Sequence, residues 1–453
     1  MVREIVIIGS GAAGITAASS ARKTDPDAKI TVFTEDEDIA YSPCAIPWAI
    51  EEKFAWDSMV MHTPEHYSKN KNINVLTRTK VDSVDDGAKT VAAGGKTYRY
   101  DSLIVATGGK AFMPPINDLG LEGVFIVRTV QDGKRIQSYL KNVRRAAVCG
   151  AGAIGLEMAV ALTNLGKEVT VVEMMDQVLP RIADKDMADR VQKYLEDKGI
   201  KFVLRAPIQA VKGTGKVSGV VAGDKEYPCE MVVFATGVRA NTDIPKQMGL
   251  DIGQLGAVVV APTLQPYKKG RIVPGVFAAG DVIQFESAVM PGPTMSQLGS
   301  SAVRQGMVAG TNAAGGRALY GPVASPWVSV IGDTEIAGTG LSMSLAAWYG
   351  VDVICGMADG LTRARYDPNA KRMIVKVLAD TASRRLIGAQ IIAGEGATGR
   401  IDWLTSAIVS GMTAEDFLIR AENAYCPPTS MVKDIVISAV EDLCEKLKCE
   451  RPK

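Results

Sequence analysis

Apolar residues in the first third of the chain fall into short continuous runs, the pattern of buried parallel strands. One run covers residues 3 to 8, an alanine-rich helix is predicted from there to about Lys23, and a second run covers Lys29 to Phe33. Short alternating strands are predicted around Asn74–Arg78 and Thr90–Tyr100. The order of strand, helix and strand at the start predicts a Rossmann-like α/β unit.

The same order returns in the middle of the chain. A strand is predicted at 145 to 149, a helix at 153 to 165 and a strand at 168 to 172. After about Trp327 the pattern changes to a strand, a helix and long antiparallel strands, followed by helices at 399–410, 414–422 and 431–447. A third domain of this kind, without a nucleotide motif, is often an oligomerisation unit.

The fold class that these patterns predict is α/β, with two Rossmann-like domains and a C-terminal α+β domain for dimerisation. At 453 residues the chain is too long for one core, which agrees with about three domains. We place the first domain at 1–112 and 246–325, the second at 113–245 and the third at 326–453.

Composition and charge remove several classes of partner. Basic and acidic residues nearly cancel, 51 against 50, so neither nucleic acid nor an anionic membrane is expected. Seven cysteines are scattered without a CxxC pair, which argues against a disulfide scaffold or a metal site and favours a reducing compartment. A strand from Glu4 leaves no room for a signal peptide and no apolar run spans a membrane, so we expect a cytoplasmic protein.

Two glycine motifs occupy the strand-to-helix turns of the two α/β units. The first is Gly9-Ser10-Gly11-Ala12-Ala13-Gly14, with Glu35 just after the next strand. The second is Gly150-Ala151-Gly152-Ala153-Ile154-Gly155, with Glu173 in the matching place. Such a motif indicates a dinucleotide, because the glycines let the backbone approach a pyrophosphate and the acid accepts from a ribose hydroxyl. Two motifs predict two dinucleotides.

Specificity at the second motif is predicted from the residues after Glu173. These are Met174 and Met175, with no arginine or lysine to meet a 2′-phosphate. Repulsion between the carboxylate and that phosphate favours NADH over NADPH. Each unit closes with an Ala-Thr-Gly, at Ala106-Thr107-Gly108 and Ala235-Thr236-Gly237, which puts small residues where the chain passes close to a nucleotide.

The stretch Tyr41-Ser42-Pro43-Cys44-Ala45-Ile46-Pro47-Trp48 holds the first cysteine of the chain, and the next is Cys149. Its two prolines are expected to forbid a regular helix and to hold Cys44 in a fixed, non-repetitive backbone. A thiol held in this way can be aimed at a bound group. The alternative is a buried structural cysteine in a proline turn.

Two GxGxxG units, two Ala-Thr-Gly closures, an Ala-Gly-Asp strand and a mixed C-terminal domain, in this order, resemble the FAD-dependent pyridine nucleotide-disulfide oxidoreductases. The resemblance covers the whole chain and implies FAD at the first motif and NAD(P)H at the second. The segment around Cys44 is similar to the one-cysteine branch, which includes coenzyme A disulfide reductases, polysulfide or persulfide reductases, NADH oxidases and NADH peroxidases. Oxidases and peroxidases typically carry a histidine in the first glycine loop, where this chain has alanines, so oxygen or peroxide reduction is less favoured.

The resemblance implies a homodimeric flavoprotein that passes electrons from NAD(P)H through FAD to a disulfide, persulfide or polysulfide at one redox cysteine. Coenzyme A is a candidate component of that substrate. The alternatives are an NADH oxidase and an electron-transfer reductase for a protein partner. Because the cysteine acts as a thiolate, we expect the flavin environment and nearby amides to bring the pKa of Cys44 below about 8.5.

Three further features bear on the same site. A strand delivers Gly280 and Asp281 to one point, where the carboxylate can bond a flavin polyol hydroxyl or, alternatively, cap a turn. A helix predicted over 293–313 carries Gln297-Leu298-Gly299 in its first turns, with amides that can face a flavin oxygen. The only histidines, His62 and His66, are expected to be exposed rather than catalytic.

Residue roles carried over from the family complete the expectation. Catalytic roles fall to Cys44, to Tyr425 as a proton donor with Tyr366 as a weaker candidate, and to Cys426 as a second thiol; alternatively, Cys426 only replaces the family's usual alanine. Substrate contacts are expected from Thr16, Ser20 and Lys23 of the first helix and from Tyr425 and Lys433 of the other subunit. The residues expected to bind the dinucleotides are Gly9, Ser10, Gly11, Ala12, Ala13, Gly14, Glu35, Ser42, Cys44, Val81, Ala106, Thr107, Gly108, Gly280, Asp281, Gln297, Leu298, Gly299, Gly150, Gly152, Ala153, Ile154, Gly155, Glu157, Glu173 and Gly237.

Overall fold

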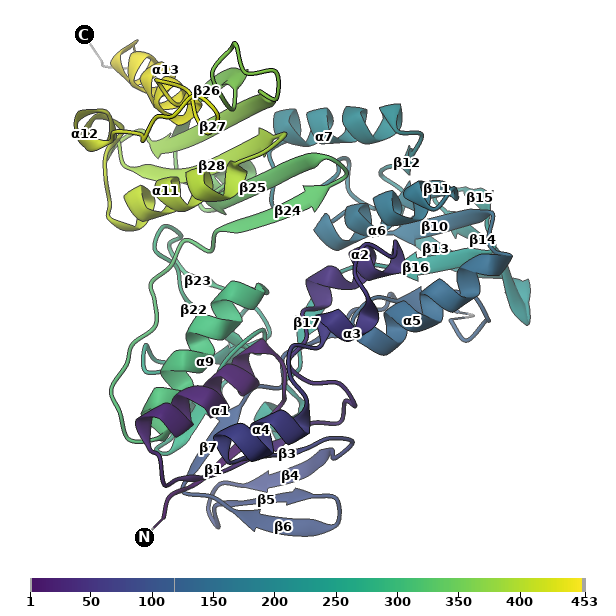
Figure 1. The fold of residues 1–453 in the computed structure, drawn as a ribbon, viewed down its shortest axis with the longest axis vertical. Coiled ribbons are helices and arrows are strands. Elements are labelled where there is room, and N and C mark those ends of the chain that lie inside the picture. Colours follow the sequence, from purple (N-terminus) through teal and green to yellow (C-terminus); the bar gives the residue numbers. More distant parts are fainter. Residues whose placement is uncertain (1, 118, 450–453) are drawn as a thin grey trace.

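The structure is a computed structural model that describes residues 2–117 and 119–449, without the side chain of residue 449. Three five-stranded sheets organise the chain, and each gathers its own helices (Figure 1). The predicted domain limits remain predictions, and the ends at 1 and 450–453 lie outside the described residues. No helix in the described ranges is long and apolar enough to cross a membrane.

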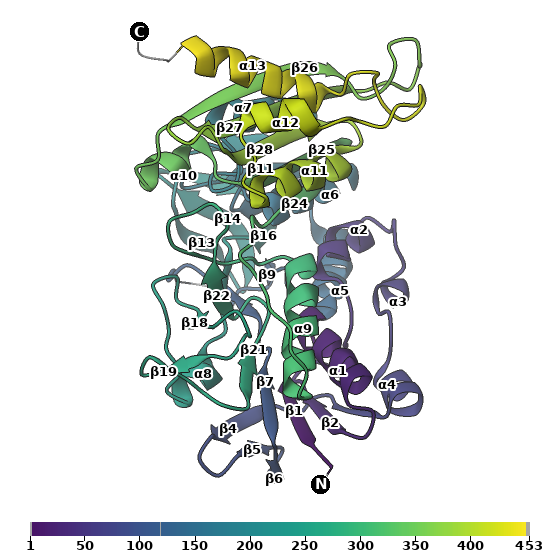
Figure 2. The ribbon, with the colours of Figure 1, turned by 90° about the vertical axis from the view of Figure 1, so that its left-hand side faces the viewer.

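The first sheet is parallel and lies nearest the N-terminus. Its strands, in spatial order, are β21 (Val276–Ala278), β7 (Ser102–Val105), β1 (Glu4–Ile8), β2 (Lys29–Phe33) and β3 (Ile73–Leu76). Helices α1 (Ala12–Thr24) and α9 (Gly299–Ala313) lie side by side against it, as Figure 2 shows. Continuous apolar strands suit this sheet, because buried parallel strands are covered on both faces. Nearby are α4 (Pro64–Lys71) and the meander β4 (Val81–Asp85), β5 (Thr90–Ala93) and β6 (Lys96–Arg99). Helix α3 (Trp56–Met59) instead packs in the core of the second sheet.

The second sheet is also parallel and repeats the first. Its strands, in spatial order, are β12 (Lys201–Val203), β11 (Glu168–Val172), β10 (Arg145–Cys149), β16 (Met231–Phe234) and β9 (Val124–Ile126). Its helices are α5 (Val130–Tyr139), η2 (Leu140–Asn142), α6 (Ala153–Asn164) and α7 (Lys185–Asp197). An antiparallel sheet of β13 (Ile208–Thr214), β14 (Lys216–Ala222) and β15 (Lys225–Pro228) belongs to the same region.

Short strands connect the large sheets. Strands β8 (Gly109–Ala111) and β17 (Val238–Ala240) pair antiparallel where the chain passes between the first and second sheets. The remaining small elements are α8 (Asp243–Gln247), β18 (Val258–Val259), β19 (Tyr267–Lys268), β20 (Arg271–Ile272), β22 (Ile283–Glu286) and β23 (Pro293–Thr294).

The third sheet is antiparallel and forms the C-terminal region. Its order is β24 (Trp327–Ile331), β25 (Thr334–Gly340), β28 (Leu386–Ala393), β27 (Arg372–Asp380) and β26 (Val353–Leu361). The helices that accompany it are α10 (Met343–Trp348), α11 (Ala397–Val409), α12 (Ala414–Arg420) and α13 (Ile435–Cys449).

Two predicted helix starts were wrong. The helix expected over 293–313 begins only at Gly299, because Pro293 and Thr294 form β23 and Leu298 is an extended N-cap. Gln297 therefore precedes the helix, and its Nε2 atom donates to the Val238 carbonyl oxygen at 3.0 Å. The helix expected from 431 begins at Ile435, after a loop that Asn423 holds by accepting from the Asp434 amide at 3.2 Å.

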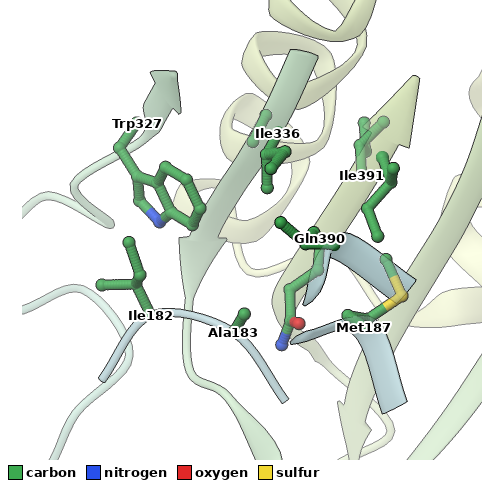
Figure 3. A pocket seen from close by; sticks show the side chains of 10 residues that line it. Ile182, Ala183, Met187, Trp327, Ile336, Gln390 and Ile391 are labelled. Carbon is green, nitrogen blue, oxygen red and sulfur yellow. The ribbon is translucent and has the colours of Figure 1, made fainter. Parts of the chain in front are cut away.

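A buried ion pair lies at the seam between the second and third sheets. Lys376 on β27 is 2% exposed, and its Nζ atom lies 2.9 Å from Oδ2 of the buried Asp184 and 2.8 Å from Oδ1 of Asp186. Oδ1 of Asp184 also accepts from the Met343 amide at 2.8 Å. The Asp184 amide donates to the buried Gln390 at 2.9 Å, and Figure 3 shows Gln390 in the narrow crevice along this seam. The start of α7 is thus fastened to the C-terminal sheet.

Candidate active site

The first glycine loop connects β1 to α1 in a conformation that requires glycine. Gly9 has a φ of +108°, and a β-carbon built on it would lie 2.1 Å from the Ala106 carbonyl oxygen. A β-carbon on Gly14 would lie 1.9 Å from the Gly9 carbonyl oxygen. Gly11 instead faces open space, which is the room that a pyrophosphate needs. The loop therefore fits a dinucleotide.

The second glycine loop repeats this geometry between β10 and α6. Gly150 also has a φ of +108°, and its β-carbon would lie 2.4 Å from the Ala235 carbonyl oxygen. A β-carbon on Gly155 would lie 2.0 Å from the Gly150 carbonyl oxygen, whereas one on Gly152 would face open space. In each unit the alanine of the Ala-Thr-Gly closure passes directly under the glycine loop, which explains why both positions are small.

The acids that follow the two loops differ in their contacts. Glu35 is exposed just beyond β2. Glu173 is only 7% exposed, and its Oε2 and Oε1 atoms accept from the amides of Ala151 and Met175, both at 2.8 Å. A carboxylate has about four acceptor positions, so Glu173 can brace the second loop and still accept from ribose hydroxyls.

Several elements meet around Asp281, just beyond β21. Its Oδ2 atom accepts from Nη2 of Arg128 at 3.1 Å. A β-carbon on Gly280 would lie 3.1 Å from that of Ala13, so α1 passes close to this point. The Gly280 amide donates to Oε1 of Gln305 at 2.7 Å, and Nε2 of this fully buried side chain has no partner among the described residues. A buried unpaired amide beside a carboxylate fits a polar cofactor here.

The other residues expected to bind cofactor lie in four places. Thr107 follows β7 and donates to the Asn241 carbonyl oxygen at 2.7 Å. Gly108 and Gly237 both have positive φ, at +63° and +106°, and Ser42 is the N-cap of the turn that carries Cys44. Val81 starts β4 and is buried in the core of the first sheet.

Cys44 lies in a 3₁₀ turn, η1 (Pro43–Ala45), that runs directly into helix α2 (Ile46–Ile50). The prediction that two prolines forbid a helix here was wrong. Pro43 and Pro47 each occupy the first turn of their helix, where a backbone N–H lacks a helical partner and proline is tolerated.

The side chain of Cys44 is exposed, which is inconsistent with a buried structural cysteine. Helix α2 buries Ile46 and Ile50 in the core of the second sheet, against α5 and α6. The thiol thus follows the first glycine loop in sequence but is held by the unit that carries the second.

The pKa of Cys44 is raised by the groups of this chain. Although the thiol reaches solvent, partial burial by the surrounding protein is the largest cause of the raised pKa. The negative charge of Glu157 raises this pKa further. The hydrogen bond from Ser42 and the charge of Arg128 act in the opposite direction but do not prevail. The expectation that the flavin environment and nearby amides bring this pKa below about 8.5 stays a prediction, because these causes all come from the chain itself. Burial and the charge of Glu157 thus oppose ionisation of this thiol.

Glu157 lies on α6, two residues after Gly155. Its Oε1 atom accepts from Oγ of Ser329, on β24, at 2.5 Å. Burial raises the pKa of Glu157 to about 7, and the bond from Ser329 lowers it. This carboxyl therefore ionises less readily than an exposed glutamate.

Tyr366 and Tyr425 lie together on the C-terminal region, with hydroxyl oxygens 3.3 Å apart. Both are exposed, at 74% and 44%, and so is Cys426. The hydrogen bond with Tyr366 raises the pKa of Tyr425. Figures 1 and 2 place the connection between α12 and α13, which carries Tyr425, far from α2, so one chain alone does not unite Tyr425 with Cys44.

The residues predicted to contact substrate are likewise split. Thr16, Ser20 and Lys23 share one face of α1, where the first two are half-buried and the third is exposed. Lys433 lies on the C-terminal region and pairs with Glu441 at 2.7 Å. The two sets therefore lie on different regions of one chain.

Sequence reasoning missed three residues, Arg128, Gln305 and Ser329. Arg128 directly precedes the capping box of Thr129 and Asp132, a signal that predicts the start of α5 but not a pairing with Asp281.

The two histidines of the chain lie together at the start of α4. The exposed His62 stacks on the half-buried His66 with ring centroids 4.1 Å apart.

Two family profiles match the chain. One, described as pyridine nucleotide-disulphide oxidoreductase, covers residues 3–306, and the dimerisation domain of the same family covers 326–435. The chain belongs to the pyridine nucleotide-disulphide oxidoreductases. This confirms the resemblance, the fold class and the assignment as an enzyme, and the family implies FAD and NAD(P)H as cofactors.

Relatives that match almost the whole length of this oxidoreductase are named either as NADH oxidases or as polysulfide or persulfide reductases. The NADH oxidase of Methanocaldococcus jannaschii is 44% identical over 98% of this chain and 99% of its own. The NAD(P)H coenzyme A polysulfide/persulfide reductase of Pyrococcus horikoshii is 32% identical over 96% and 97%. The solved structure of a NAD-dependent persulfide reductase from A. fulgidus matches with a TM-score of 0.94 at 32% identity, over 98% of this chain and 84% of that one.

Proposed function

We propose that this oxidoreductase uses NADH to reduce sulfur–sulfur bonds in a persulfide, polysulfide or disulfide, and that Cys44 receives the substrate sulfur. The observation that carries the proposal is an exposed thiol at the start of α2, held between the two dinucleotide units. The next cysteine in sequence, Cys149, is buried in β10, so it is not an obvious resolving thiol. A cytoplasmic setting is part of the proposal, since the six cysteines with described side chains are all free.

The chemistry that follows is thiol–disulfide exchange. As a thiolate, Cys44 attacks one sulfur of R–S–S–R′, forms a bond from Sγ to that sulfur and releases the other as a thiolate, which takes up a proton. Bound FAD supplies the relay by which two electrons from NADH reach sulfur and break the new bond. The overall balance is NADH + H⁺ + RSSR′ giving NAD⁺ + RSH + R′SH. The chain's task is to hold the thiol, exclude competing acceptors and deliver protons.

A homodimer would complete this site from the partner's C-terminal region. The dimerisation profile and the exposure of Tyr366 and Tyr425 support the idea, and a phenol is a suitable donor to a departing thiolate. Thr16, Ser20 and Lys23 of one chain with Lys433 of the other would then flank a coenzyme A portion of the substrate. Cys426, beside Tyr425, would face Cys44 of the opposite chain as a second thiol.

Subunit mixing tests this shared site. Two differently tagged chains, Cys44→Ser and Tyr425→Phe, are purified as a heterodimer. Because one of its two sites then combines an intact Cys44 with an intact Tyr425, we expect about half of the wild-type turnover. The Tyr425→Phe homodimer should fall roughly 100-fold and the Cys44→Ser homodimer at least about 1000-fold. A heterodimer as inactive as the homodimers would place both residues in one chain, whereas a fully active Tyr425→Phe homodimer would show that Tyr425 is not part of the site. If mass spectrometry of the oxidised dimer detects no Cys44–Cys426 disulfide, Cys426 is not a second thiol of the site.

The preference for NADH over NADPH is proposed from Glu173. Replacing it by glutamine removes the negative charge but keeps an acceptor for the Ala151 amide. We expect Glu173→Gln to lower the ratio of kcat/KM for NADH over NADPH by about tenfold, the equivalent of about 1.4 kcal/mol. An unchanged ratio in flavin reduction assays would show that other groups set the preference. The variant Glu35→Gln is the control, because it alters the acid of the other unit.

An NADH oxidase is the second candidate, favoured by the relative with 44% identity that bears this name. The absence of a histidine from the Gly9–Gly14 loop speaks against it. The test is NADH consumption by the FAD-loaded enzyme, under argon with coenzyme A disulfide, coenzyme A persulfide or polysulfide, and separately with oxygen alone. Fast turnover with sulfur and slow turnover with oxygen supports the proposal. The reverse identifies an oxidase, and activity only with a redox protein identifies an electron-transfer reductase.

A further inference from the structure

A hydrogen bond links the C-terminal region to the helix of the second dinucleotide unit. Ser329 is 7% exposed on β24, and its Oγ atom donates to Oε1 of Glu157 at 2.5 Å. The residues are 172 positions apart in sequence. Among the described residues, this is the one side-chain hydrogen bond that the Glu157 carboxylate makes.

The packing around this bond fixes the serine in its place. Side chains of a strand alternate between faces, so Trp327, Ser329 and Ile331 share one face of β24. Ile331 and Trp327 belong to the hydrophobic core of the second sheet, together with Leu156 of α6. Ser329 is therefore the polar member of an apolar strip that docks β24 on α6, and it meets the acid there.

The same helix α6 also packs against α2, the helix that begins directly after the turn of Cys44. The charged groups that act on the Cys44 thiol are Glu157 from α6, Arg128 before α5 and Asp281 after β21. Arg128 and Asp281 neutralise each other through their ion pair. Glu157 makes no ion pair with the described residues, burial raises its pKa, and the Ser329 hydroxyl favours its ionised form.

We propose that Ser329 is a positioning residue through which the C-terminal region controls the charge of Glu157 and, by way of that charge, the reactivity of the Cys44 thiol. A hydroxyl that donates to a carboxylate favours the ionised form. Without Ser329, Glu157 stays neutral to higher pH, and Cys44 loses the negative charge that opposes its own ionisation. The inference deepens the proposed function because it concerns the same thiol, but it holds whichever acceptor the enzyme uses.

Alkylation of Cys44 tests the inference without any sulfur acceptor. The FAD-loaded enzyme, reduced with a thiol that is then removed, reacts with iodoacetamide between pH 6 and 9, and peptide mass spectrometry gives the rate at each cysteine. We expect Ser329→Ala to raise the rate at Cys44 about threefold at pH 7.5, close to the effect of Glu157→Gln. Ser329→Thr, which keeps the hydroxyl, should match the wild type. The half-buried Cys355 on β26, which lies outside the proposed site, is the internal control, and its rate should not change.

Two outcomes would overturn the inference. If Ser329→Ala matches the wild type while Glu157→Gln reacts faster, Ser329 does not control the acid. If Glu157→Gln also matches the wild type, the charge of Glu157 does not reach Cys44. Infrared titration of the carboxyl band assigned with Glu157→Gln gives a second readout, and Ser329→Ala should move its midpoint to higher pH. Failure of the sulfur-reductase proposal would leave all of these measurements unaffected.

Discussion

Replacing Cys44 by serine is expected to abolish sulfur reduction, by at least about 1000-fold in kcat, while NADH still reduces the bound flavin at close to the wild-type rate. A serine hydroxyl does not ionise near neutral pH and forms no bond to sulfur that two electrons can reopen. The exposed position of Cys44 at the start of α2 means that the substitution removes chemistry and little packing. Anaerobic titration with NADH measures the result directly.

Wild-type enzyme that first reacts with a disulfide substrate, so that Cys44 carries a mixed disulfide, should take up two reducing equivalents before the flavin bleaches fully and should develop a long-wavelength charge-transfer band. The Cys44→Ser variant should bleach in one step without that band. The control is Cys355→Ser, a half-buried cysteine on β26 of the C-terminal region, which should behave as the wild type. Identical one-step bleaching in wild type and Cys44→Ser would contradict the redox role. Oxygen consumption that survives in Cys44→Ser would be incidental flavin oxidation.

Replacing Lys376 by methionine is expected to cost about 3–5 kcal/mol, which lowers the unfolding midpoint of the C-terminal region by about 10 °C. Burial alone would lower the pKa of Lys376, but its contacts with Asp186 and Asp184 outweigh burial and raise it, so the side chain is charged in the fold. Methionine fills the same space but leaves the buried Asp184 carboxylate without its cation. Thermal unfolding of the FAD-loaded enzyme, followed by circular dichroism, measures the change.

Two matched variants separate charge from packing in this experiment. Lys193→Met removes an exposed lysine of α7 that pairs with Asp197, and it should shift the midpoint by at most about 3 °C because exposed pairs contribute little. The double variant Lys376→Met with Asp184→Asn removes both buried charges and keeps an acceptor for the Met343 amide, so it should recover most of the loss. A Lys376→Met protein as stable as the wild type would show that the ion pair does not fasten the seam.

Local pattern was sufficient for most of the fold. The strands predicted at 29–33, 145–149 and 168–172 agree with β2, β10 and β11 residue for residue. The two glycine motifs identified the loops that require positive φ at Gly9 and Gly150. These features depend on backbone sterics and on apolar runs within a few residues, so adjacent residues in the sequence are sufficient to predict them.

Local pattern was not sufficient at two proline-containing segments, where the position of the proline relative to a helix start decides its effect. The prolines around Cys44 were read as helix breakers, but in the first turn of a helix they are compatible with it. The glycine-proline segment before residue 299 became a strand paired with β22, which delayed the start of α9. In both cases the missing information was the position of the proline relative to a helix start.

The sequence by itself determined that this protein binds two dinucleotides on paired α/β units, belongs to the pyridine nucleotide-disulphide oxidoreductases and carries one cysteine beside the first unit. Only the tertiary structure decided that α2 packs on the second unit, that Ser329 meets Glu157 and that Lys376 is buried against Asp184. The reason is physical. Turn geometry and strand burial are encoded by adjacent residues, whereas a hydrogen bond or ion pair between residues more than 150 positions apart depends on how whole domains dock.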